Sequence, residues 1–259
     1  MREIPARAAS APGGREFARR VQALSGLARD TIVRAELLSG NVPGFLRHLV
    51  PVRVSSSPGR AVDVTVCVLP DYLAVGSDSD FVFVPMGLKA ALEVADHLGF
   101  ELPTPKLVDA IYAAAPVKLK PQPLPASDRM RSTAYVLYHT QLIREQHDAR
   151  QMPWGVLTAG EKKDLVLTSR LWSFPDRVAI YGWHRAEDQP IQPLSTVHGS
   201  RYADYSHGVR LVSTTVYVNG QARATAEVRR EPALASLISA EGRVPDPREL
   251  LQRLERQQP

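Results

Sequence analysis

Cysteine is almost absent from the sequence, since Cys67 is the only one in the chain. A single thiol can form neither an internal disulfide nor a thiolate metal cluster. Cys67 stands in the valine-rich run 62–69, which offers none of the positive, partly exposed surroundings that activate a thiol. We therefore expect a small buried core residue here and not a nucleophile.

Long apolar runs are also lacking. No stretch approaches the roughly 18 apolar residues that span a bilayer, and the N-terminal segment lacks the apolar part of a secretory signal. We therefore expect no membrane span, and the sequence as given predicts a cytoplasmic protein. The residues Ala8-Ala9-Ser10-Ala11, however, resemble the small-residue end of a signal peptide. If the chain is a trimmed mature form, the prediction becomes a periplasmic or extracellular protein.

A continuous basic block is missing as well, although the net charge is +5. Lys and Arg are spread along the chain, as on an ordinary solvated surface, so nucleic acid is not an expected partner. Hydrophobic residues at 44% and charged residues at 23% are typical of a globular protein. The length of 259 residues is near the upper limit for one hydrophobic core.

The order of the local patterns along the chain predicts a single main domain. Residues 1–14 are rich in Ala, Pro and Gly without apolar periodicity, which predicts a disordered leader. We expect residues 15–259 to form one α+β domain. It would have a helical and hairpin part at 15–150, a β-rich part that bears the site at 151–230, and a helical tail at 231–259.

Apolar periodicity defines the expected elements of this domain. Helical spacing occurs in 15–39, 87–98, 105–112 and 132–150, and strand patterns occur in 62–69, 72–76, 81–84, 164–168, 177–183, 209–218 and 221–228. Asn219-Gly220, between the last two runs, is the strongest hairpin signal. The fold class expected is α+β, with a mainly antiparallel sheet and with N-terminal and central helices packed against it.

Most of the residues capable of chemistry crowd into the segment from Lys162 to Arg210, among several glycines. Polar side chains at the ends of expected strands are typical of a cleft. The candidate catalytic residues are His184, His198, Asp204 and His207, which we expect to converge on one concavity. The candidate substrate-binding residues are Lys162, Lys163, Asp164, Trp183, Gln192, Tyr205, Ser206 and Arg210.

The sharpest short motif is Asp204-Tyr205-Ser206-His207-Gly208. In a straight strand alternate residues share a face, so Ser206 and His207 would not form a nucleophile and base pair. His207 is better interpreted as a solvent-facing base or ligand, with Ser206 as a positioner. Asp204 would fix one imidazole tautomer only if the chain turns here. By the same alternation Lys162 and Asp164 share a strand face, and we expect one of them at the rim of the site.

A metal site is a less favoured interpretation of the same histidines. His184, His198 and His207, with Asp204 or His139, would supply ligands that zinc accepts. None of the usual helical histidine or paired-cysteine spacings is present, however. We therefore expect no metal and no cofactor, with zinc kept as the alternative.

Two resemblances accompany these motifs. His198-Gly199 and Ser206-His207-Gly208 resemble elements of the L,D-transpeptidase family, but Val209 stands where that family has its cysteine nucleophile. More of the chain resembles an uncharacterised, often exported bacterial protein family, through the runs GNVPGFLR (40–47), PDYLAVGSD (70–78), LPTPK (102–106), KKD (162–164), YGWH (181–184) and DYSHG (204–208). This second resemblance implies one contiguous domain and a trimmed N-terminus, and it implies no activity. Glu161 departs from it, because the family pattern commonly has histidine there.

These observations leave three hypotheses about function. The first is a hydrolase or transferase that acts on a cell-envelope or extracellular polymer through a cleft of His, Asp and Lys side chains. The second is a non-catalytic domain that binds a glycan or a peptide with the same residues. The third is a structural domain whose histidines are hydrogen-bonded in the core. The expected partner is a polymer or peptide, and the sequence predicts no oligomeric state.

Overall fold

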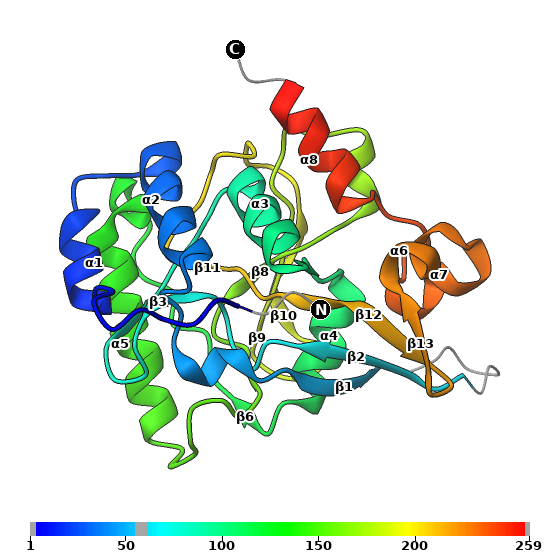
Figure 1. Ribbon diagram of the computed structural model, residues 1–259, viewed down its shortest axis with the longest axis horizontal. Coiled ribbons are helices and arrows are strands. Elements are labelled where there is room, and N and C mark those ends of the chain that lie inside the picture. The colour runs from blue at the N-terminus through cyan, green and yellow to red at the C-terminus, as the bar shows by residue number, and fades with distance from the viewer. Residues whose placement is uncertain (1–3, 55–61, 257–259) are drawn as a thin grey trace.

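The computed structural model describes residues 4–54 and 62–256 (Figure 1). It confirms the expected α+β class, because the sheets are mainly antiparallel and helices pack against them. Helices α1 (Gly14–Arg20), α2 (Gly26–Leu38) and α5 (Thr133–Asp148) gather at one end of the molecule, and the long strands of the main sheet extend toward the other end (Figure 1). None of the helices in the described ranges combines the length and the apolar character that a bilayer crossing requires.

The main sheet has the strand order β1-β2-β12-β13, and every pair in it is antiparallel. Its strands are β1 (Val50–Val54), β2 (Val64–Val68), β12 (Val212–Val218) and β13 (Gln221–Ala224), with β5 (Phe100–Glu101) also paired to β12. The alternate valines of β2 are buried, as the strand pattern predicts. Asn219 and Gly220 have φ angles of 51° and 77°, so the expected hairpin between β12 and β13 is confirmed.

A second, smaller sheet positions the candidate site. Its order is β10 (Pro190–Ser195), β9 (Ile180–His184), β8 (Lys163–Leu165) and β11 (His207–Gly208). β11 runs parallel to β8 and places His207 opposite Lys163. The sequence patterns do not predict this pairing, because a two-residue strand has no periodicity.

Shorter pairings complete the β structure. The hairpin of β3 (Ala74–Gly76) and β4 (Phe81–Phe83) is the one expected across the acidic turn. β6 (Val117–Lys118), in the proline-rich connector, pairs in parallel with β7 (Thr158–Ala159). Single 3-10 turns lie at η1 (Gly44–Arg47), η2 (Asp128–Arg131) and η3 (Ser169–Trp172).

The helices begin and end close to where the sequence places them. The first expected helical stretch is a pair, α1 (Gly14–Arg20) and α2 (Gly26–Leu38), followed by α3 (Leu88–Leu98), α4 (Pro105–Ala114) and α5 (Thr133–Asp148). Thr104 caps α4 by accepting a hydrogen bond from Leu107 N, and Ser132 caps α5 in the same way. α4 packs against β1 and β9, and α5 packs against β4.

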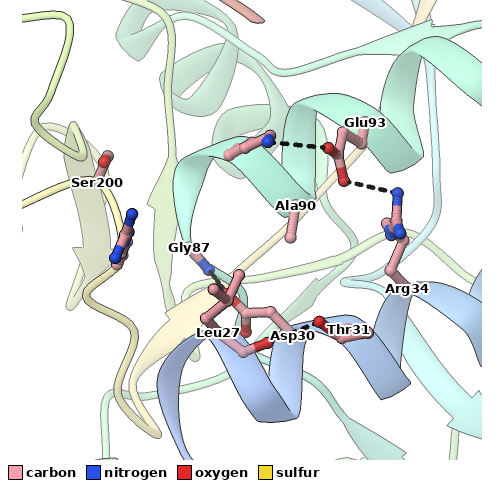
Figure 2. Close-up of a pocket in the computed structure, with 10 residues that line it drawn as sticks. Leu27, Asp30, Thr31, Arg34, Gly87, Ala90, Glu93 and Ser200 are labelled. Carbon is pink, nitrogen blue, oxygen red and sulfur yellow. Dashed lines mark hydrogen bonds and ion pairs between the residues drawn. The ribbon is translucent and has the colours of Figure 1, made fainter. Parts of the chain in front are cut away.

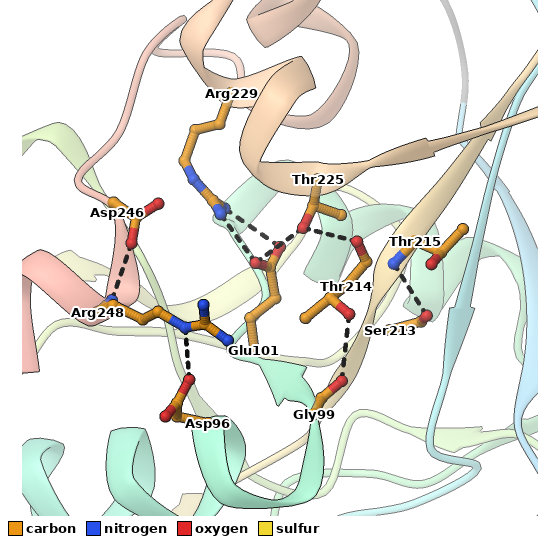
Figure 3. A network of polar contacts seen from close by, with 10 residues as sticks. All are labelled: Asp96, Gly99, Glu101, Ser213, Thr214, Thr215, Thr225, Arg229, Asp246 and Arg248. Carbon is orange, nitrogen blue, oxygen red and sulfur yellow. Dashed lines mark hydrogen bonds and ion pairs between the residues drawn. The ribbon is translucent and has the colours of Figure 1, made fainter. Parts of the chain in front are cut away.

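The C-terminal region departs from the expected strand at 221–228. β13 ends at Ala224, and the chain continues as α6 (Thr225–Arg230), α7 (Pro232–Ile238) and α8 (Pro247–Arg256). The helix brings Thr225 and Arg229, one turn apart, to the same carboxylate of Glu101, at 3.0 and 2.9 Å (Figure 3). In a strand these two residues would lie on the same face about 13 Å apart, too far for both to reach one carboxylate, so the shared carboxylate favours the helix.

Buried apolar side chains form two clusters. The larger surrounds β3 and β4 and includes residues of α1, α2, α3, α5 and β8. The smaller lies between the main sheet, α4, and the helices α6 and α7. Within residues 4–13, part of the leader that the sequence predicts to be disordered, side chains make contacts with the rest of the fold. Arg7 Nε donates to Asn41 Oδ1 at 2.9 Å, and Ile4 packs on the core.

Candidate functional site

Asp204 is the carboxylate of the DYSHG motif, and three hydrogen bonds hold it in place. Its Oδ1 accepts hydrogen bonds from the backbone N and the Oγ of Ser206, at 2.8 and 2.6 Å, and its Oδ2 accepts one from Tyr202 Oη at 3.1 Å. Burial opposes the ionisation of Asp204, but the neighbouring His207 and the bonds from Ser206 outweigh it and lower its pKa. Asp204 is therefore an ionised, fixed acceptor.

His207 lies beside this carboxylate because the chain turns between them. The backbone N of His207 donates to the Asp204 carbonyl at 3.1 Å, and Nε2 comes within 3.8 Å of Asp204 Oδ2. The turn is the condition under which the sequence predicts that Asp204 orients the imidazole. The side chain is fully buried and not solvent-facing as expected. Burial lowers the pKa of His207 to about 4, so the imidazole is neutral at pH 7.

Neither ring nitrogen of His207 has a hydrogen-bond partner in the described part of the chain. A neutral imidazole carries one donor and one acceptor, and leaving such groups buried and unpaired costs about 1–3 kcal/mol. This imidazole therefore keeps its capacity to exchange a proton with another molecule.

Three half-buried side chains, Lys163, His198 and Tyr202, lie between solvent and the buried Asp204–His207 pair. Lys163 faces the same side of the sheet as His207, with Nζ 5.0 Å from the Trp183 ring centroid. Burial lowers the pKa of Lys163, and Asp204 partly restores it. The ring of His198 stacks on Tyr202 at 4.0 Å, and Tyr202 in turn lies 5.7 Å from the His207 ring. We define the His207 cluster as Lys163, His198, Tyr202, Asp204, Ser206 and His207.

Asp164 and Arg210 lie elsewhere, inside the core. Tyr72 Oη donates to Asp164 Oδ2 at 2.8 Å, and the Arg210 guanidinium lies 4.4 Å from the centroid of the Tyr72 ring. Arg210 donates to the carbonyls of Leu69 and Thr158 at 2.9 and 2.7 Å. Burial raises the pKa of Asp164 to about 7 in spite of Arg210. Both side chains hold segments of the fold together and neither lines an opening, which differs from the substrate-binding role expected of them.

Lys162 is equally buried, so neither Lys162 nor Asp164 forms the rim that alternation predicts. Lys162 Nζ donates to the Tyr205 carbonyl at 2.7 Å and lies 3.2 Å from His139 Nδ1. Burial lowers its pKa to about 8. The phenol of Tyr205 accepts from Leu124 N at 2.6 Å, so Tyr205 is also a structural side chain.

A buried pair of carboxyl groups lies next to this lysine. Burial raises the pKa of Asp71 and of Glu161. Glu161 raises the pKa of Asp71 further, whereas Arg210 and Asp71 oppose the rise for Glu161. Glu161 has no donor for either oxygen among the described residues if it is ionised. These directions favour a proton on Asp71, which can then donate a hydrogen bond to Glu161.

His184 does not join the other three candidate catalytic residues. Its Nε2 lies 3.0 Å from Asp109 Oδ1, its ring stacks on Tyr112 at 4.6 Å, and Asp109 also accepts from Tyr181 Oη at 2.8 Å. The expectation of one concavity for all four residues is therefore wrong in the case of His184. The cause is its position at the end of β9, where it faces α4.

Two further candidates contribute less than expected. Gln192 lies on β10, the outer strand of its sheet, and its amide donates to the neighbouring Pro193 carbonyl at 2.9 Å. Trp183 is 5% exposed and lies beneath Lys163, so it supports the His207 cluster from below and does not form an open wall.

The histidines are also not arranged for a metal ion. No group of three or more His, Cys, Asp or Glu side chains within residues 4–54 and 62–256 is placed to hold one. His184 bonds to Asp109, and His139 to Lys162, so the ligand set considered for zinc is divided over separate places.

Several residues of the structural network escape the sequence interpretation. Tyr202 precedes Asp204 by two positions and could have been recognised as a donor to it once a turn is assumed. Asp71 and Tyr72 follow directly after a buried strand, and this position at a strand end was an available signal. Asp109 gave no such signal, because its partner His184 lies more than 70 residues away in the sequence. Glu161 gave none either, because its neighbour Asp71 is also acidic.

No protein-family model matches the chain, and comparisons with curated proteins and with solved structures find no similar protein. The geometry is therefore the basis for a functional assignment.

Proposed function

We propose that this chain is a hydrolase or transferase in which His207 is the general base and Asp204 balances its charge. The observation that carries this proposal is the state of His207. It is a neutral imidazole with two unpartnered nitrogens, 3.8 Å from a carboxylate that Ser206 and Tyr202 hold in place. A purely structural histidine would be expected to have its nitrogens bonded.

The cluster supplies the groups that acid–base catalysis needs. One nitrogen of His207 would take a proton from a water molecule or from an acceptor hydroxyl, and the resulting imidazolium would face the Asp204 carboxylate. The ammonium group of Lys163 lies on the same side of the sheet and would stabilise negative charge that develops on the substrate. His207 would then return its proton to the leaving group.

We propose a cell-envelope or extracellular polymer as the substrate. This part rests on the resemblance of the six sequence runs to an often exported bacterial family. The half-buried side chains of Lys163, His198 and Tyr202 add a charged and aromatic surface of the kind that binds glycans and peptides.

A non-catalytic glycan- or peptide-binding domain is the second candidate, and the burial of His207 favours it. The His207 side chain has no exposed surface, so a polymer would meet Lys163, His198 and Tyr202 first. Such a domain would use these three side chains for binding and would need no proton transfer.

The test compares His207→Gln with His48→Gln, a control at an exposed histidine outside the cluster. Both variants and the parent protein are incubated with peptidoglycan and polysaccharide fragments, and products and binding are measured together with thermal unfolding. Loss of a general base is expected to lower the rate about 10²–10⁴-fold in His207→Gln only. Below pH 4 the parent should also lose activity, because His207 becomes protonated.

Two outcomes would contradict the catalytic proposal. The first is turnover by His207→Gln at the parental rate. The second is saturable fragment binding by the parent with no product formed, which would identify the binding domain instead.

A further inference from the structure

A pocket of about 220 Å³ lies between α2, the start of α3 and the segment 200–201 (Figure 2). Its lining includes no residue of the His207 cluster. Its lining residues carry charges of both signs and are Leu27, Asp30, Thr31, Arg34, Gly87, Lys89, Ala90, Glu93, Ser200 and Arg201. Its size suits a small molecule and not a polymer chain.

Asp30 is the unusual residue of this pocket. It is 4% exposed, and its Oδ2 accepts a hydrogen bond from Gly87 N, the residue that precedes α3, at 2.9 Å. Oδ1 has no partner among the described residues. Burial raises the pKa of Asp30 to about 6, although the Gly87 bond and Arg29 oppose the shift. A buried carboxylate oxygen without a donor is costly, and a donor on a bound molecule would remove that cost.

Arg201 lacks the opposite kind of partner, a negatively charged acceptor. Its side chain is exposed and makes no hydrogen bond or ion pair with any residue in the described ranges, so its guanidinium is free for an anion. The other cations of the pocket are already paired with Glu93, Arg34 at 3.0 Å and Lys89 at 3.7 Å (Figure 2). The pocket therefore has one carboxylate oxygen that lacks a donor and one cation that lacks an anion.

The backbone brings the segment that carries Arg201 close to Asp30. Leu88 N donates to the Ser200 carbonyl at 2.7 Å, which ties the segment carrying Arg201 to the start of α3. A Cβ atom added at Gly87 would lie 2.8 Å from the Ser200 carbonyl oxygen and 3.0 Å from Asp30 Oδ2, so only glycine allows this close approach. Figure 2 shows Asp30 and Gly87 facing each other, with Ser200 across from them.

We propose that this pocket binds a free α-amino acid, with the ammonium group on Asp30 and the carboxylate on Arg201. The ammonium supplies the donor that Oδ1 lacks, and guanidinium binds a carboxylate with two parallel hydrogen bonds. The inference does not depend on the hydrolase or transferase proposal, because it concerns equilibrium binding to other side chains. The segment 200–204 joins the two sites, since Arg29 Nη2 donates to the Ala203 carbonyl at 3.4 Å and Asp204 follows directly.

The experiment is titration calorimetry of the full chain with glycine, L-alanine, D-alanine and L-glutamate. Methylammonium and acetate are titrated separately as ligands that carry only one of the two charges. Saturable binding of at least one amino acid, and much weaker binding of both single-charge ligands, are expected. The variants Asp30→Asn and Arg201→Gln should each weaken binding about tenfold or more, the usual effect of losing a charge-assisted hydrogen bond.

Arg243→Gln is the matched control, because Arg243 is exposed and outside the pocket. It should bind like the parent. Arg201 is also exposed, so its variant is expected to fold normally, and thermal unfolding of Asp30→Asn checks that this variant folds. The proposal is overturned if no amino acid binds saturably, if Arg201→Gln binds like the parent, or if methylammonium or acetate binds as tightly as the amino acids.

Discussion

At the scale of single residues, the ionisable groups are chiefly buried inside the fold. Asp164 is the clearest case, because its carboxyl is 4% exposed and bonds to Tyr72 while Arg210 lies 4.0 Å away. Arg210 is committed to two backbone carbonyls, so it compensates the carboxylate only in part. The protonated form of Asp164 is consequently favoured by folding.

This state predicts how Asp164 affects stability. Its folded pKa of about 7 lies above the value of 3.8 for an unperturbed aspartate, so its contribution is present below pH 3.8 and is lost as the pH rises toward 7. Relative to Asp164→Asn, the parent should lose about 1.4 kcal/mol of unfolding free energy for each pH unit in this window. Urea unfolding of both proteins from pH 4 to pH 8 measures the difference.

Asp176→Asn is the control for this series, because the Asp176 side chain is 62% exposed. Its stability difference from the parent should stay nearly constant over the same range. If the difference in unfolding free energy between the parent and Asp164→Asn is also constant from pH 4 to pH 8, Asp164 is already ionised in the folded protein at pH 4 and the prediction is wrong.

At the scale of elements, the local signals predict much of the fold. α3 lies where the apolar spacing places it and ends at Gly99, whose φ of 79° suits a glycine cap. The hairpin at Asn219-Gly220 was predictable for the same kind of reason, since two adjacent residues with positive φ favour this dipeptide.

Elements that depend on distant partners could not be predicted. The pairing of β8 with β11 joins residues about 40 positions apart through a two-residue strand, and the buried Lys162 and Arg210 lie beside these two strands in the sequence. The conversion of 225–230 from an expected strand into α6 depends on Glu101. The Asp204–His207 contact was predictable only as a conditional statement about a turn, and the Asp109 partner of His184 was not predictable at all.

The Glu101–Arg229 pair offers a test at this scale (Figure 3). Both side chains are 5% exposed, so Glu101→Gln leaves a buried guanidinium without its counter-charge. We expect this variant to lose about 3–5 kcal/mol of unfolding free energy, and Glu101→Gln with Arg229→Met to lose less. Denaturant unfolding measures both.

The second ion pair in Figure 3 is the matched control. Arg248 is 74% exposed in its pair with Asp96, so Arg248→Gln should change the unfolding free energy by about 1 kcal/mol or less. Equal losses of unfolding free energy for the two pairs would contradict the inference that the buried Glu101–Arg229 pair stabilises α6.

At the scale of the whole molecule, two apolar clusters share one scaffold. Leu69 belongs to the larger cluster and Val68 to the smaller, and Arg210 ties the Leu69 carbonyl to that of Thr158. We therefore expect the chain to unfold in one cooperative transition.

Tryptophan fluorescence can test this expectation, because Trp154 packs against the larger cluster whereas Leu107 lies in the smaller. Leu107→Ala should remove about 2–5 kcal/mol and lower the melting temperature measured by fluorescence as much as that measured by circular dichroism. A fluorescence transition that stays at its parental temperature would show two independent domains.

The strand order of the main sheet also has a consequence for synthesis on the ribosome. β2 pairs with β12, which is translated roughly 150 residues later. At about 5–20 residues per second, the nascent chain presents β2 with one edge unoccupied for about 7–30 s before its neighbour is made. During that interval the valine-rich edge is open to other nascent chains, so chaperone supply should limit the yield of this protein more than its final stability does.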